Sequence, residues 1–268
     1  MTSHTRGSVE RTNEGPVAVL ELTRLGRRNA WGPDMADDLI RHLTDITADG
    51  KTLACVVTGA DGTFSSGVDL GQDHVHSTPS AGAFLRSFDP HRHAVFSALL
   101  EFRKPLICAV SGPAIGLGFV LALHCDVVLV SDSARFALPN TKLGILPASG
   151  ALARLAQWVG RGRAFDIGLT GRMVGAEEAV AIGLAVRRLP GDDALRAAAM
   201  EYAGQLASYP PLAVWATKES LDTGLEAGSP RLARLMDGYR LGMLQMTEDS
   251  AEAHTAWQEK REPRYRAE

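Results

Sequence analysis

Two glycine-bearing segments about fifty residues apart constrain the fold of this chain more than any other feature. They are Phe64–Leu70 and Ser111–Gly118, and each follows a short apolar run, Leu53–Thr58 or Leu106–Val110. Small residues let a backbone approach a ligand closely, so such a turn can direct a backbone N–H group into open space. Two N–H groups aimed at one point would form an oxyanion hole, which stabilises a carbonyl oxygen while negative charge builds on it.

The bulk composition narrows the class of protein. The 268 residues are enough for one large α/β domain or two small ones. Aromatic residues make up only 6% and the net charge is −3, so we expect neither a nucleic-acid partner nor attraction to an anionic membrane. Three cysteines without a CxxC pair (Cys55, Cys108, Cys125), a polar N-terminus and no membrane-length apolar run predict a cytoplasmic protein.

Short apolar runs alternate with helical patterns, which predicts an α/β fold. The expected strands are Val17–Leu22, Leu53–Thr58, Leu106–Val110 and Val127–Val130, and the expected helices are Met35–Ile46, His91–Phe102, Leu117–His124 and Ala151–Val159. The order strand, strand, helix recurs, unlike the strict alternation of a doubly wound sheet. Residues 1–15 are predicted to form a flexible N-terminus.

Beyond Pro190 the pattern is helical. Helices are expected over Asp193–Ala207 and Leu212–Thr223, with Pro210-Pro211 as the break between them. A third helix is indicated by an apolar stripe at helical spacing, formed by Leu232, Leu235, Met236, Tyr239, Met243 and Met246. We interpret this stripe as a packing surface, either for the α/β core or for a neighbouring subunit.

The glycine segments, their order and the surrounding residues resemble the crotonase (enoyl-CoA hydratase/isomerase) superfamily over nearly the whole chain. The matching elements are Arg27–Ala30, Phe64–Leu70, Ala109–Asp126, Phe136–Pro147, Thr170-Gly171, Ala176–Leu184 and Trp257–Pro263. The resemblance implies a crotonase spiral of repeated β-β-α units over residues 16–205. It also implies a helical C-terminal segment at 206–268 for packing, and assembly as a homotrimer or a dimer of trimers.

The resemblance implies roles for residues in both turns. The backbone N–H groups of Val68 and Leu117 would form the oxyanion hole, and the ligand would be a coenzyme A thioester without a separate cofactor. The residues expected to bind this substrate are Arg28, Ala30, Ser66, Gly67, Asp69, Leu70 and Gly116. Arg28 is the candidate residue for binding a phosphate of coenzyme A. For Asp69, the alternative to substrate binding is a structural role within the protein.

The chain departs from the family at the two positions whose side chains transfer protons in family hydratases. Family hydratases use two glutamates, and the matching positions here are Val120 and Asn140. Addition of water requires a base and an acid, which valine cannot supply and which asparagine does not supply near neutral pH. Ala148 and Ser149 occupy the region where some members carry another acid. We therefore predict weak or absent hydratase activity, although the enolate-stabilising turns remain.

Histidines in the segment that usually walls the acyl pocket are candidates for an unconventional base. His91 and His93 are two positions apart on an expected helix, so both cannot face one pocket. The alternative is that these histidines, with His74 and His76, are exposed loop residues. A His-x-His pair also occurs in zinc sites, but no third ligand has matching spacing, so we expect no metal.

Two classes of function remain open, and a third is disfavoured. The first is an acyl-CoA enzyme, for which decarboxylation of a malonyl-type thioester fits best because loss of carbon dioxide itself forms the enolate. Hydrolysis of a thioester or β-diketone, and isomerisation with an unconventional base, are alternatives within this class. The second class is a non-catalytic acyl-CoA-binding homologue. RNA binding has only family precedent, and the acidic, aromatic-poor composition argues against it.

Overall fold

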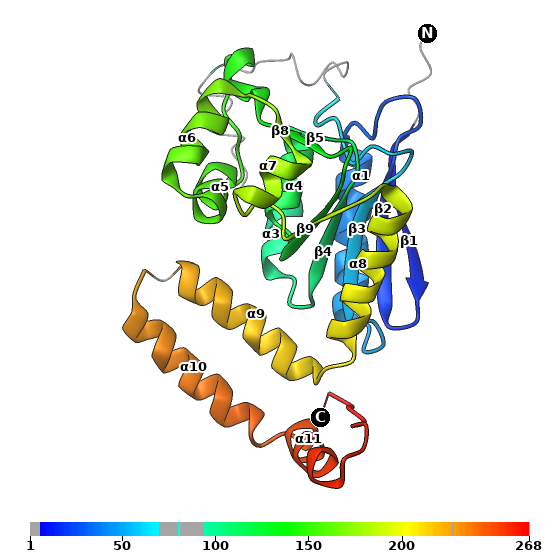
Figure 1. The fold of residues 1–268 in the computed structure, drawn as a ribbon, viewed down its shortest axis with the longest axis vertical. Helices are drawn as coiled ribbons and strands as arrows, with labels where there is room; N and C mark the ends of the chain where they lie inside the picture. The colour runs from blue at the N-terminus through cyan, green and yellow to red at the C-terminus, as the bar shows by residue number, and fades with distance from the viewer. Residues whose placement is uncertain (1–5, 70–79, 81–93, 227, 268) are drawn as a thin grey trace.

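The centre of the fold is a six-stranded sheet in the order β1-β2-β3-β4-β6-β9 (Figure 1). The structure, a computed structural model, describes residues 6–69, 80, 94–226 and 228–267. The strands are β1 (Ser8–Glu14), β2 (Val17–Thr23), β3 (Ala54–Gly59), β4 (Leu106–Val110), β6 (Val127–Ser131) and β9 (Arg187–Leu189). Strand β1 is antiparallel to β2, and the other neighbours are parallel. The carboxyl ends of β2, β3, β4 and β6 therefore meet at one edge of the sheet.

Helices cover both faces of this sheet, which explains why the central strands are almost continuously apolar. The helices are α1 (Pro33–Ala48), α3 (Ala94–Glu101) and α4 (Leu117–Leu123) on one face and α8 (Asp192–Ala207) on the other. Strand β2 shows the two-residue alternation that this arrangement needs. Ala18, Leu20 and Leu22 pack in the core on the α1 side, whereas Val17 and Val19 pack in the core under α8.

A second, smaller sheet positions the glycine-rich segment. It has the order β5-β7-β8, in which β5 is parallel to β7 and β7 is antiparallel to β8. Its strands are β5 (Pro113–Ile115), β7 (Arg135–Ala137) and β8 (Val174–Gly175). The elements that follow β7 are the 3₁₀ helix η3 (Pro139–Leu143) and the helices α5 (Ala151–Val159), α6 (Arg161–Thr170) and α7 (Ala176–Ala181). Strand β5 thus lies between Gly112 and Gly116, where the chain leaves the main sheet and enters α4.

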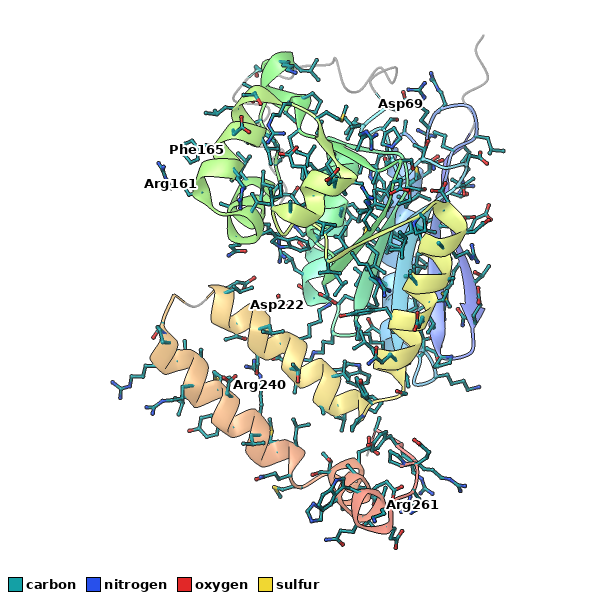
Figure 2. All side chains as sticks on the ribbon, viewed as in Figure 1. Asp69, Arg161, Phe165, Asp222, Arg240 and Arg261 are labelled. Atoms are coloured by element: carbon teal, nitrogen blue, oxygen red, sulfur yellow. The ribbon has the colours of Figure 1, made fainter. Side chains whose placement is uncertain are left out.

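The C-terminal helices are α9 (Pro211–Glu226), α10 (Pro230–Leu244) and α11 (Glu248–Glu259). Lys218 of α9 ion-pairs with Asp126 at 2.9 Å and donates to the carbonyl oxygen of Lys104 at 3.1 Å. The buried Arg240 of α10 reaches Glu219 of α9 at 3.1 Å, so it lies between the two helices (Figure 2). Within the described ranges, none of the helices combines the length and apolar character needed to cross a bilayer.

The α/β prediction is confirmed, and two expectations differ from the structure. The prediction of a flexible segment at 1–15 is wrong for Ser8–Glu14, because all seven residues pair with β2 and Val9 is buried. The predicted boundary between residues 205 and 206 falls inside α8, which packs against the core under the sheet as far as Leu206 and Ala207. The expected helix His91–Phe102 is described from Ala94 onward.

The apolar stripe on α10 does not pack against the core of its own chain. Leu235, Tyr239 and Met243 are 53%, 63% and 64% exposed. Among the described residues, this stripe is therefore largely exposed.

His124 follows α4 and is a buried packing residue. It is 5% exposed, and its ring centre lies 4.8 Å from that of Phe96. Its Nδ1 atom donates to the carbonyl oxygen of Val120 at 2.8 Å. Burial disfavours the charged imidazolium and lowers the pKa of His124 to about 4, from an ordinary value of 6.5.

This histidine should make the protein sensitive to mild acid. The unfolded chain binds a proton at His124 near pH 6.5, whereas the folded chain does so only near pH 4. The free energy of unfolding should therefore fall by about 3 kcal/mol as the pH drops through this window. The free energy of unfolding, measured with urea at several pH values, should depend less on pH in His124→Gln than in wild type. The exposed His254→Gln is the control, and parallel curves for wild type and H124Q would contradict the prediction.

Candidate active site

Backbone hydrogen bonds join the two glycine segments. The N–H of Phe64 donates to the carbonyl oxygen of Ser111 at 2.8 Å, and the N–H of Ser65 donates to that of Pro113 at 2.9 Å. The N–H of Ile115 in turn donates to the carbonyl oxygen of Ser65 at 2.9 Å. This parallel ladder holds the turn after β3 against β5, so segments fifty residues apart in sequence lie side by side.

Two glycines allow the close approach of these segments. Gly67 has φ +87°, and a Cβ atom there would lie 2.7 Å from the carbonyl oxygen of Ile115 and 3.5 Å from the nitrogen of Leu117. A Cβ atom at Gly118 would lie 2.7 Å from the carbonyl oxygen of Ser65. Helix α4 therefore begins directly against the first turn, an arrangement that a larger residue at either position would disturb.

The N–H groups of Val68 and Leu117 are left without backbone acceptors in the described part of the chain. Trp31 donates to the carbonyl oxygen of Gly67 at 2.7 Å and accepts from the N–H of Asp69 at 3.1 Å. In this parallel bridge the N–H of the intervening Val68 points away from Trp31. Leu117 is the first residue of α4, where an N–H has no partner within the helix. Two donors thus lie on adjoining turns.

A buried asparagine supports the first turn from below. Asn29 is 2% exposed, and its Nδ2 atom donates to the carbonyl oxygens of Ala60 at 3.0 Å and Thr63 at 2.7 Å. Its Oδ1 atom accepts from the N–H of Arg24 at 3.0 Å, and its own carbonyl oxygen accepts from the hydroxyl of Ser65 at 2.7 Å. All hydrogen bonds of its side chain go to backbone groups in loops, outside any strand or helix.

Several residues predicted to bind substrate lie around this turn. Arg28 is exposed with φ +50°, and its carbonyl oxygen accepts from the N–H of Ser66 at 2.9 Å. Ala30 is buried next to this contact. Gly116, with φ +53°, donates its N–H to the carbonyl oxygen of Ala137 at 2.8 Å, which ties the second turn to β7. The structure therefore brings these predicted residues together.

Asp69 is engaged within the protein. Its side chain is buried, and its carboxylate lies 3.3 Å from the guanidinium of Arg24 and 3.7 Å from that of Arg27. It lies at the end of the molecule away from α10 and α11 (Figure 2). These contacts favour the structural alternative for Asp69 over direct binding of a ligand.

The two positions without proton carriers lie on different elements, α4 and η3. Val120 is on α4, one turn after Leu117, and is only 3% exposed. Asn140 is in η3, which follows β7 directly. Its Oδ1 atom is buried and has no hydrogen-bond partner among the described residues. An unsatisfied buried oxygen of this kind typically costs about 1–3 kcal/mol.

Other predicted residues lie outside the described ranges. These are Leu70, His91 and His93, together with His74 and His76. Among the residues that the structure does describe, no group of three His, Cys, Asp or Glu side chains is arranged to hold a metal ion. The sequence analysis missed Arg24 as a site residue and included Asn29 only within the matching element Arg27–Ala30.

The fold and the site define an α/β protein that presents backbone N–H groups from two adjoining turns. The sequence profile of the enoyl-CoA hydratase/isomerase family matches residues 12–268, and the chain belongs to this family. It is 34% identical to the 2,3-dehydroadipyl-CoA hydratase of Escherichia coli K12, over 93% of this chain and 95% of that protein. It is also 34% identical to the carnitinyl-CoA dehydratase of Salmonella arizonae, over 97% and 98% of the two chains.

The solved structures include close relatives in fold. An enoyl-CoA hydratase subunit from Geobacillus kaustophilus superimposes with a TM-score of 0.89 and 30% sequence identity, over 97% of this chain and 98% of that chain. The crotonase fold that the sequence resemblance implied is therefore confirmed.

The close contact at Gly67 yields a prediction. Gly67→Ala should separate the two turns, because the added methyl group would overlap the carbonyl oxygen of Ile115. The positive φ alone costs about 1–2 kcal/mol, and the overlap should add to that loss in urea unfolding. Gly26→Ala is the matched control, since Gly26 has φ +71° with nothing within 4 Å of the added atom. Equal losses for the two variants would contradict the prediction.

Proposed function

We propose that this protein binds a coenzyme A thioester and stabilises an enolate-like oxyanion with the backbone N–H groups of Val68 and Leu117. One observation carries the proposal: two turns in direct contact each leave an N–H without a backbone acceptor in the described part of the chain. Loss of one such donor typically costs roughly 3–4 kcal/mol of transition-state stabilisation. Because both donors belong to the main chain, a side-chain substitution cannot remove them, but it can displace the turns that carry them.

Residues on the surface around these turns are proposed to bind the rest of the substrate. The exposed Arg28 is proposed to bind a phosphate of coenzyme A, since a guanidinium pairs well with this anion. The thioester itself supplies the coenzyme, so no separate cofactor is part of the proposal. The three free, buried cysteines favour a reducing compartment, and we include a cytoplasmic location in the proposal.

We further propose that the protein is not an efficient enoyl-CoA hydratase. Hydration needs one group to activate water and one to deliver a proton, and Val120 and Asn140 can do neither. Asn140 would orient a ligand by hydrogen bonds, because its amide can donate and accept without exchanging a proton. The names of the relatives describe hydratases and a dehydratase, and they are transferred here only at the level of the family.

Decarboxylation of a malonyl-type thioester is the reaction that these residues support best. The bond between the α-carbon and the carboxylate breaks, carbon dioxide leaves, and the electron pair moves to the thioester oxygen as an enolate. The two amides would stabilise that oxygen, and water would then return a proton to the α-carbon. This route requires no side chain that removes a carbon-bound proton.

A non-catalytic acyl-CoA-binding homologue is the alternative, favoured by the inert pair Val120 and Asn140. Hydrolysis and isomerisation with an unconventional base are further alternatives within the enzyme class. A panel of malonyl-type, enoyl and saturated CoA thioesters, followed by mass spectrometry, separates these possibilities. Release of carbon dioxide supports the decarboxylase, whereas binding without turnover of any member supports the non-catalytic homologue.

The missing proton carriers yield a prediction about hydration. Wild-type protein should hydrate crotonyl-CoA weakly or not at all. The double variant Val120→Glu/Asn140→Glu restores both carboxyl groups and should raise the rate by at least about 100-fold. The absorbance of the enoyl thioester measures this rate. Val120→Gln/Asn140→Gln is the control of equal size, and efficient hydration by wild type would contradict the prediction.

The exposed stripe on α10 yields a prediction about assembly. We propose a homotrimer or a dimer of trimers in which this stripe contacts a neighbouring subunit, because large exposed apolar patches mark interfaces. Leu235→Glu/Tyr239→Glu should shift the mass measured by light scattering toward the monomer. Arg234→Glu, an exposed position on another face of α10, should leave the assembly intact. A monomeric wild type would contradict the proposal.

A further inference from the structure

Arg24 is a buried arginine whose contacts all lie beside the first turn. It follows β2 directly and is only 4% exposed. One terminal nitrogen donates to the carbonyl oxygen of Ala30 at 3.1 Å and to Oδ2 of Asp69 at 3.3 Å. The other donates to both carboxylate oxygens of Asp34, at 3.2 and 3.1 Å. The guanidinium thus joins three separate segments of the chain.

Two of these partners, Ala30 and Asp69, lie next to the residues that hold Val68, which carries the proposed oxyanion donor. Ala30 precedes Trp31, whose N–H and carbonyl oxygen bond to Gly67 and Asp69. Val68 is the residue between Gly67 and Asp69, so its N–H is oriented by this short bridge. Arg24 connects the two sides of the bridge, one through a carbonyl oxygen and the other through a carboxylate.

The burial of this network makes its geometry strict. A buried charge is tolerated when it is paired, and the removal of one partner is costly. Both terminal nitrogens of Arg24 are paired, whereas its buried Nε atom has no partner among the described residues. Arg27 also approaches Asp69, but its side chain is 44% exposed and the distance is 3.7 Å, so its contribution is screened. Only the planar fork of arginine can reach the carbonyl oxygen and both carboxylates at once.

We propose that Arg24 is a positioning residue, which fixes the orientation of the Val68 N–H through Ala30 and Asp69 without touching the substrate. This inference rests on the proposed function of that N–H group. It assigns the Arg24–Asp69 pair a role beyond stability, because a small rotation of the 67–69 segment would weaken the hydrogen bond to the thioester oxygen.

The test measures the hydrogen bond itself. The probe is butyryl-CoA with an isotopic label at the thioester carbonyl, whose infrared stretching frequency falls when the oxygen accepts stronger hydrogen bonds. Arg24→Lys keeps the positive charge but loses the fork. We expect R24K to bind butyryl-CoA with little change in dissociation constant and to lose most of the frequency shift that wild type produces.

Two further variants make the result specific. Arg11→Lys is the matched control, since Arg11 of β1 also joins separate segments, through Asp49 at 3.4 Å and Thr52 at 3.2 Å, and should keep the wild-type shift. Asp69→Asn removes the charge from the other member of the pair while it keeps an oxygen acceptor. It should reproduce the loss, and it provides the test if R24K does not fold.

The outcomes separate this inference from the proposed function. A wild-type shift that persists in folded R24K and D69N overturns the role of Arg24 alone. A wild type that binds butyryl-CoA without any shift overturns the proposed oxyanion hole, and the positioning role with it.

Discussion

The structure depends on the pairing of one residue, Ser65, with strand β5. Its N–H and its carbonyl oxygen bond to Pro113 and Ile115, which fixes both the position and the register of the first turn. A slip by one residue would exchange the groups that face the ladder for the groups that face outward. The placement of the Val68 and Leu117 amides follows from this register, as does the need for glycine at position 118, where helix α4 meets Ser65.

Buried polar side chains hold the loops around the site that the backbone ladder does not reach. The loops around Arg24–Ala30 and Ala60–Thr63 carry backbone groups that no sheet or helix satisfies, and buried groups of this kind need partners. Asn29 donates hydrogen bonds to the loop after β3, and Arg24 donates to the carbonyl oxygen of Ala30 and to the carboxylate of Asp69. Stability and site geometry are therefore difficult to separate here, which is why a spectroscopic measurement on a bound carbonyl is more informative than a melting temperature.

The sequence predicted those elements whose signal is local. Leu106–Val110 and Ala151–Val159 have the predicted bounds, because apolar runs end at clear breakers. Strand β1 was missed because its sequence is mostly polar, as befits an edge strand that exposes one face. The two turns were predicted, but the pairing of Arg24 with Asp69 was not, since these residues are 45 positions apart and only the folded loops bring them together.

The division between backbone and side-chain chemistry explains how a chain can belong to this family while its reaction stays open. The proposed oxyanion donors are main-chain groups, so no side-chain substitution can remove them. Proton transfer requires side chains, and the two positions proposed for it, 120 and 140, lie outside that ladder. Under the proposed function, the inert pair of valine and asparagine leaves the substrate to form the enolate, and a thioester that loses carbon dioxide does so.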